Sequence, residues 1–124
     1  MNPHPPEVVL LVGGDLLARA RLERAVADAG AELRTTSPEK MLDAIGSERP
    51  DLLVLDLDRG QSGVLEDLAD ARSRNLPTER VVGYFSHVDS SLRAQAQAAG
   101  CRALPRGRFW NTLPKELRAR GNET

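Results

Sequence analysis

Short apolar runs alternate along this chain with longer stretches in which apolar residues recur every three or four positions. Short runs of this kind are typical of β-strands, and the longer periodic stretches are typical of amphipathic helices. The pattern predicts five strands, at residues 8–12, 31–35, 51–57, 81–85 and 101–104. Because a predicted helix follows each strand, we expect an α/β fold with a parallel sheet covered by helices on both faces.

The predicted helices are delimited by residues that commonly begin or end a helix. Gly30 is expected to end the first helix as its C′ residue, and Ser37 with Pro38 supplies an N-cap and a first-turn proline for the second. Asp89 or Ser90 is expected to cap the fourth helix. The helices should cover about residues 17–29, 38–47, 64–74, 90–99 and 113–120, the last with Pro114 in its first turn.

The third predicted strand is the most informative segment, because its almost uninterrupted apolar run ends in two carboxylates, Asp56 and Asp58. Such a run is typical of a strand buried on both faces in the middle of a parallel sheet. Open α/β sheets bind their ligands at the carboxyl ends of the strands. Asp56 is therefore placed for chemistry; the alternative is that both aspartates only solvate the end of the strand.

Length and composition narrow the class of protein. The 124 residues predict one domain at residues 7–120, between a disordered leader at 1–6 and a tail at 121–124. A net charge of −1 does not favour nucleic acid or an anionic membrane as a partner. No apolar run approaches the roughly 18 residues that span a bilayer, and the leader lacks the features of a signal peptide. We therefore expect a cytoplasmic protein.

Several features occur together in the order found in a known family. Segment 50–57 ends an apolar strand at Asp56, Ser86 follows the fourth strand, Ala99 and Gly100 close the fourth helix, and Gly30 ends the first. In this the chain resembles the receiver domain of bacterial response regulators (CheY-like) over about residues 8–117. The resemblance implies a flavodoxin-like, three-layer fold with a five-stranded parallel sheet in the order 2-1-3-4-5. It also implies a role in two-component signal transduction, with Asp56 as the phosphoacceptor.

The chain departs from this family at the metal pocket. Family members usually carry two adjacent acidic residues after the first strand, and these positions are Gly13 and Gly14 here, followed by Asp15. Mg²⁺ requires oxygen ligands in near-octahedral geometry and commonly uses carboxylates. Asp15, Asp56 and Asp58 would remain as metal ligands. We therefore expect no cofactor, with Mg²⁺ as the alternative.

The cationic side of the pocket departs as well. The family's lysine after the fifth strand, which pairs with the phosphoryl group, falls on Gly107 without a gap and on Arg106 with a one-residue deletion. An arginine can bind a phosphoryl group bidentately but is not equivalent to a lysine. Leu104 or Ala103 replaces the family's aromatic switch residue. These departures indicate an atypical, degenerate receiver.

Other chemistry has weaker support in the sequence. Gly13 and Gly14 lack the later glycines of a dinucleotide-binding fingerprint, although a helix N-terminus there could still bind an anion. Ser86, His87 and Asp89 do not form a hydrolase triad, because no nucleophile-elbow turn surrounds Ser86 and neighbours in an extended segment point to opposite faces.

Phe109 and Trp110 are half of the four aromatic residues of the chain and lie beside the last predicted helix. They form either a core plug that caps the sheet or the anchors of an interface. We take the interface as the prediction.

Together these features predict a stand-alone receiver-like domain that is not an enzyme and acts by protein–protein contact. Its partner would be a signalling protein, a histidine kinase or an output protein, bound by the fourth helix, fifth strand and last helix; a homodimer stays open.

Two alternatives remain. In a working receiver Asp56 would take phosphate from a histidine kinase, Asp15 and Asp58 would support Mg²⁺, and Ser86 and Arg106 would steady the phosphoryl group. In a small-molecule or anion sensor, the crevice at Gly13 and Gly14 would bind the ligand.

Overall fold

The computed structural model describes residues 6–58, 61–86 and 90–121. Its centre is a parallel sheet of five strands in the order β2-β1-β3-β4-β5. The family resemblance implied this flavodoxin-like strand order, and the structure confirms the predicted order. The strands are β1 (Val8–Val12), β2 (Glu32–Thr36), β3 (Leu52–Asp56), β4 (Val81–Phe85) and β5 (Arg102–Pro105).

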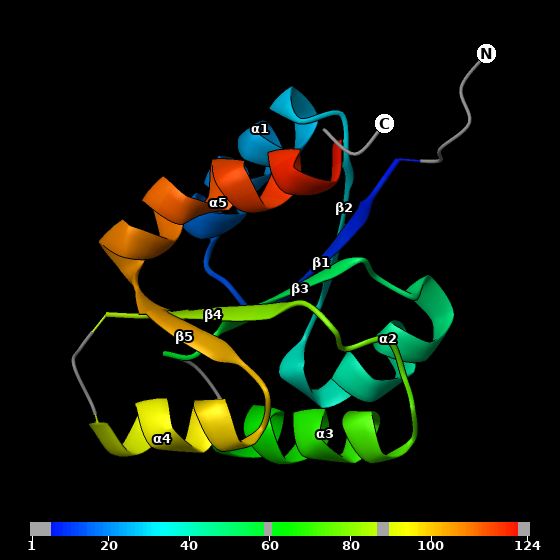
Figure 1. Cartoon of the computed structure of the whole chain (residues 1–124), viewed down its shortest axis with the longest axis vertical. Helices are drawn as coiled ribbons and strands as arrows, with labels where there is room; N and C mark the ends of the chain where they lie inside the picture. The colour runs from blue at the N-terminus through cyan, green and yellow to red at the C-terminus, as the bar shows by residue number, and fades with distance from the viewer. Residues whose placement is uncertain (1–5, 59–60, 87–89, 122–124) are drawn as a thin grey trace.

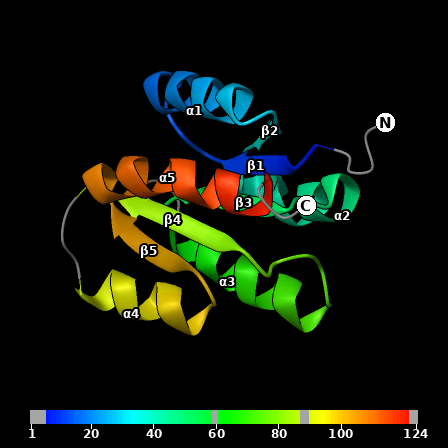
Figure 2. The same cartoon turned by 45° about the horizontal axis from the view of Figure 1, so that its top comes forward.

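The helices cover the two faces of the sheet, so the molecule has three layers (Figures 1 and 2). α1 and α5 lie over one face and α2, α3 and α4 over the other, and each face has its own apolar core. No helix in the described ranges is long and apolar enough to cross a membrane. The helices are α1 (Leu16–Asp28), α2 (Met41–Glu48), α3 (Gln61–Ser73), α4 (Ser90–Ala98) and α5 (Arg106–Gly121), with a short 3₁₀-helix, η1 (Pro38–Lys40), before α2.

The burial of the strands explains why the sequence pattern identifies them. All five residues of β3 and of β4 are buried, as expected for central strands covered on both faces. β2 is an edge strand whose residues are only partly covered, which agrees with its lower hydrophobicity. Burial of β3 and β4 on both faces therefore fixes the carboxyl edge of the sheet, where Asp56 ends β3 and Ser86 follows β4.

The helix ends agree with the capping signals in part. Gly30 has a φ of +74° directly after the C-cap Ala29, as predicted for a C′ residue. Ser37 precedes η1 rather than an α-helix and makes no side-chain capping bond, so α2 itself begins only at Met41. Asp89 lies outside the described residues, and α4 begins at Ser90.

The prediction for the last helix was wrong at its start. α5 begins at Arg106, directly after β5, and Pro114 lies inside it rather than in its first turn. The residues Phe109, Leu113 and Leu117, four apart, are all buried against the sheet, and their burial favours helix over the whole segment. Tertiary packing thus outweighs the local preference of a proline for a helix start.

A group of ion pairs joins segments at the amino end of the strands. Arg80 donates to Oε2 of Glu7 at 2.8 Å and to the carbonyl oxygen of Glu116 at 2.7 Å. Arg102 also pairs with the Glu116 carboxylate. These contacts attach α5 to the segments that precede β1 and β4, and to the start of β5.

Candidate functional site

The predicted site residues meet at the carboxyl edge of the sheet. Asp56 ends β3, Asp58 follows it, Ser86 follows β4 and Arg106 follows β5. The carboxylate of Asp15, between β1 and α1, pairs with the guanidinium of Arg106, which also pairs with Asp58. The structure thus brings all five residues into one cluster, because parallel strands end at the same edge.

Asp56 lies deepest in this cluster. Its side chain is the buried charged group of the core, with 1% of the residue exposed. Its Oδ1 accepts a hydrogen bond from the backbone N–H of Asp58 at 2.9 Å. This bond turns the chain back after β3, so that Asp58 lies beside the end of β4.

Asp58 is bound by donors from two other segments. Its Oδ1 accepts from the backbone N–H of Ser86 at 2.8 Å and its Oδ2 from the Ser86 hydroxyl at 2.7 Å. The Nε of Arg106 donates to the same Oδ2 at 3.3 Å. Partial burial acts to raise the pKa of the Asp58 carboxyl, but the hydrogen bonds from Ser86 and the guanidinium of Arg106 outweigh it and lower that pKa.

Arg106 is the residue after β5 whose side chain enters the cluster. Its guanidinium lies 5.0 Å from the centre of the Tyr84 ring, in cation–π geometry, and its Nη2 lies 3.9 Å from Oδ2 of Asp15. Gly107, the other candidate for the family's lysine position, is exposed in the first turn of α5 and has no side chain to contribute.

The metal side of the pocket has a backbone that does not suit acidic residues. Gly13 and Gly14 have φ angles of +82° and +88°, in the left-handed region that favours glycine. A Cβ added at Gly13 would lie 3.3 Å from Cβ of Asp56, closer than ordinary contact. Asp15 serves instead as the N-cap of α1, with its Oδ1 accepting from the backbone N–H of Ala18 at 2.8 Å.

These donors do not fit a Mg²⁺ site of the receiver type. Two glycines supply no charge, the Asp15 carboxylate caps a helix and the Asp58 carboxylate is bound to Ser86 and Arg106. Among the described residues no three histidine, cysteine or acidic side chains are arranged to hold a metal ion. Mg²⁺ requires several oxygen ligands in near-octahedral geometry, and this cluster would have to rearrange to supply them.

Tyr84 is a residue of this site that the sequence pattern did not indicate. It pairs with Asp56 across β3 and β4 and is fully buried, with its ring 5.0 Å from that of Phe109. Its hydroxyl lies 3.5 Å from the position that a Cβ on Gly14 would take. Burial, and then the negative charge of Asp56, raise the pKa of the Tyr84 phenol. The sequence did not identify Tyr84, because its position beside Asp56 depends on how β3 and β4 pair.

The two aromatic residues of α5 have different positions. The ring of Phe109 is buried in the core with 1% of the residue exposed, so the expectation that it anchors an interface is wrong for this residue. Trp110 is half-buried and faces α1, where the guanidinium of Arg21 lies 4.5 Å from its ring. Trp110 therefore lines a groove between α1 and α5 and does not lie on the side of α4.

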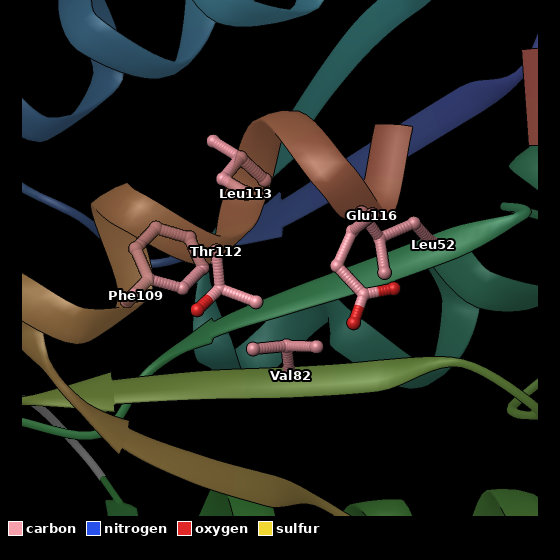
Figure 3. Close-up of a pocket in the computed structure, with 6 residues that line it drawn as sticks. All are labelled: Leu52, Val82, Phe109, Thr112, Leu113 and Glu116. Atoms are coloured by element: carbon pink, nitrogen blue, oxygen red, sulfur yellow. The ribbon is translucent and has the colours of Figure 1, made fainter. Parts of the chain in front are cut away.

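A gap between α5 and the sheet lies apart from this cluster (Figure 3). Its lining is apolar except for Thr112 and Glu116, and it is too narrow to admit a water molecule. We therefore regard it as a packing gap and not as a ligand site. The gap is lined by Leu52, Val82, Phe109, Thr112, Leu113 and Glu116.

Two further residues considered from the sequence, His87 and Asp89 of the hydrolase alternative, lie outside the described residues.

Comparisons with known proteins agree on the fold. No protein-family model and no curated protein sequence matches the chain. Among solved structures, chemotaxis protein CheY4 of Vibrio cholerae is 19% identical, with a TM-score of 0.76 over 93% of this chain and 98% of its own. The signal receiver domain of an HD domain-containing protein from Pseudomonas fluorescens is 16% identical, with a TM-score of 0.74 over 97% of this chain and all (100%) of its own.

A response regulator protein from Burkholderia multivorans is 18% identical, with a TM-score of 0.74 over 97% of this chain and 98% of its own. At such identities the likeness concerns the fold. The chain has the CheY-like receiver fold that its sequence predicted.

Proposed function

We propose that this chain is a receiver-type signalling module that contacts a signalling protein, either a kinase or an output protein, without depending on phosphorylation of Asp56. The receiver fold supports the first part, as does the meeting of Asp56, Ser86 and Arg106 at the carboxyl edge of the sheet. The solved structures that resemble the chain are described as a chemotaxis protein, a signal receiver domain and a response regulator.

The backbone at Gly13 and Gly14 is the observation that carries the second part. Both residues adopt positive φ angles, in which an aspartate at either position would be strained. A phosphoryl group on Asp56 would approach the carboxylates of Asp15 and Asp58 without the acidic pair that normally holds a metal. Each repulsive pair at about 4 Å costs on the order of 4 kcal/mol at an effective dielectric near 20. A cost of that size slows phosphotransfer roughly a thousandfold.

Phosphorylation is tested with a small-molecule phosphodonor. We expect that acetyl phosphate or phosphoramidate with Mg²⁺ leaves the intact mass of the protein unchanged. The Asp56→Asn variant is the control, because it lacks the acceptor carboxylate. A phosphoryl adduct on the wild type that is absent from Asp56→Asn would overturn the proposal in favour of a working receiver.

Beryllofluoride, a phosphoryl mimic, provides a second readout of the same question. Amide NMR spectra with and without Mg²⁺ should not differ at Asp56, Ser86 or Arg106. Mg²⁺-dependent shifts at these residues that spread to α4 and α5 would mean that the pocket holds metal and phosphoryl group together. The module would then switch by phosphorylation.

The packing at Gly14 argues against the small-molecule sensor. A Cβ added there would lie 3.1 Å from Cδ2 of Leu11 and 3.5 Å from the hydroxyl of Tyr84, so little space remains beside it. We propose the same partner-binding surface as the sequence suggested, formed by α4, β5 and α5. Trp110 does not contribute to that surface, since its ring faces α1.

A further inference from the structure

The carboxylate of Asp58 is held by the side chains that the family resemblance assigns to the phosphoryl group. Ser86 donates to it twice, from its backbone N–H at 2.8 Å and its hydroxyl at 2.7 Å. Arg106 donates from Nε at 3.3 Å. Hydrogen bonds to an ionised carboxylate are stronger than those between neutral groups. An anion from the chain itself therefore occupies these donors.

We propose that Asp58 is a built-in ligand that takes the place of a phosphoryl group at Ser86 and Arg106. It would hold the end of β4 and the junction of β5 and α5 in the anion-bound arrangement at all times. This inference rests on the proposed function, because it describes how the same pocket is regulated. It goes beyond that function in naming the group that replaces phosphorylation.

The geometry of the loop after β3 explains why Asp58 is the residue placed there. The backbone N–H of Leu57 donates to the carbonyl oxygen of Tyr84 at 2.9 Å, which continues the pairing of β3 and β4 beyond the end of β3. The N–H of Asp58 then donates to Oδ1 of Asp56. These two bonds carry the Asp58 side chain to the side of Ser86, whereas Asp56 stays below it in the core.

The charges around Arg106 support the same reading. Its guanidinium forms ion pairs with both Asp58 and Asp15, with Nε 3.3 Å from Oδ2 of Asp58 and Nη2 3.9 Å from Oδ2 of Asp15. Stacking on the Tyr84 ring at 5.0 Å limits its movement. A free phosphate entering the cluster would have to displace Asp58 from both Ser86 and Arg106, and it would be repelled by the displaced carboxylate. The wild-type pocket should therefore bind phosphate poorly.

Removing the Asp58 carboxylate should open the site to an external anion. The probe is inorganic phosphate, and the readouts are the amide signal of Ser86 and the Nε–H signal of Arg106 in NMR spectra at mildly acidic pH. We expect Asp58→Ala to shift both signals and to bind phosphate at least about tenfold more tightly than the wild type, since a repulsive charge is removed. Asp70→Asn is the matched control, because Asp70, on α3, forms an exposed 2.8 Å ion pair with Arg74, which follows that helix.

Two results would overturn the inference. Ser86 and Arg106 signals that stay unchanged in Asp58→Ala would mean that Asp58 does not bind them in solution. Equal phosphate binding by the wild type and the variant would mean that Asp58 does not occupy the site. If Asp58→Ala does not fold, Asp58→Asn is used, because it keeps the shape of the side chain and removes its charge. An Arg106 Nε–H signal that differs from that of the wild type then supports the inference, and an unchanged signal overturns it.

Repeating the titration in the Asp56→Asn background separates this inference from the proposed function. The gain in phosphate binding on Asp58→Ala should persist there, because it does not involve Asp56 chemistry. A gain that vanishes with Asp56→Asn would assign the binding to Asp56 and overturn the role of Asp58. Phosphorylation of wild-type Asp56, by contrast, would overturn the proposed function, and with it the claim that Asp58 replaces phosphorylation, but not the binding of Asp58 to Ser86 and Arg106.

Discussion

At the scale of single residues, Tyr84 shows how the pocket differs from a solvated active site. Its side chain is fully buried beside Asp56, and its hydroxyl has no hydrogen-bond partner among the described residues. A buried polar group without a partner loses its hydration and gains nothing in exchange. The ring itself is well packed against Phe109 and beneath the guanidinium of Arg106. The hydroxyl and the ring of one residue therefore have opposite effects on stability.

Tyr84→Phe should raise the free energy of unfolding by about 1 kcal/mol, because it removes the unsatisfied hydroxyl and keeps the ring. Urea denaturation measures this change. Tyr84→Leu is the control and should be destabilising, since it loses the contacts of the ring. A loss of more than about 1 kcal/mol in Tyr84→Phe would show that the hydroxyl is hydrogen-bonded in solution.

Tyr84 should also make the free energy of unfolding decrease with rising pH in the alkaline range. The pKa of the folded phenol is raised, whereas the unfolded phenol ionises near pH 10. The unfolded state alone therefore releases a proton above about pH 10, and stability from this source falls as the pH rises further. Tyr84 is the only tyrosine of the chain, so ultraviolet absorbance reports its ionisation directly. Tyr84→Phe should lack this part of the fall.

At the scale of elements, α5 combines a buried apolar stripe with an internal proline. Phe109, Leu113 and Leu117 face the core, and Pro114 lies among them. A proline inside a helix cannot donate to the carbonyl four residues earlier, here that of Trp110, and its ring crowds that carbonyl. Packing of the apolar stripe on the sheet therefore stabilises the helix enough to offset the unfavourable free energy of Pro114.

Pro114→Ala should stabilise the protein by about 1–3 kcal/mol, because alanine restores the backbone donor and has the highest helix propensity. Thermal unfolding measures this as a higher Tm. Pro77→Ala is the control, since Pro77 lies in the connection between α3 and β4, and it should cost up to about 1 kcal/mol through the entropy of the unfolded chain. Equal effects of the two substitutions would contradict the account of α5.

At the scale of the whole molecule, Arg80 joins segments that are far apart in the sequence. It bonds to Glu7 before β1 and to Glu116 on α5, and Glu116 also pairs with Arg102 at the start of β5. The side chains of Glu7 and Glu116 are 13% and 20% exposed. Removing their common partner would leave two largely buried carboxylates with less compensation.

Arg80→Leu should therefore lower the free energy of unfolding by about 2 kcal/mol or more. Urea denaturation followed by circular dichroism measures the loss. Arg24→Leu is the control, because the pair of Arg24 and Asp28 on α1 is 3.9 Å long and highly exposed, and such pairs contribute less than about 1 kcal/mol. If the two variants lose the same stability, Arg80 does not join these segments in solution.

The sequence alone determined the architecture. Buried strands must be apolar, so segments 51–57 and 81–85 were identifiable, and the second of these has the bounds of β4. The alternation of strands and helices leads to a parallel sheet, and parallel strands bring their carboxyl ends together. Asp56 could therefore be placed at this edge from the strand pattern. The resemblance to receiver domains implied Ser86, and either Arg106 or Gly107, as further residues of the same site. The replacement of two acids by Gly13 and Gly14 was also visible in the sequence.

Only the tertiary structure decided how these residues pair. The contact of Asp58 with Ser86 spans 28 residues and that with Arg106 spans 48, and both depend on a turn held by the buried Asp56. The place of Tyr84 beside Asp56 follows from strand register, and the start of α5 at Arg106 follows from burial of its apolar stripe. Local sequence patterns indicate which residues are buried and where turns can form. Hydrogen bonds and ion pairs between distant segments depend on distances of a few ångströms, which exist only once the sheet and its helices have packed.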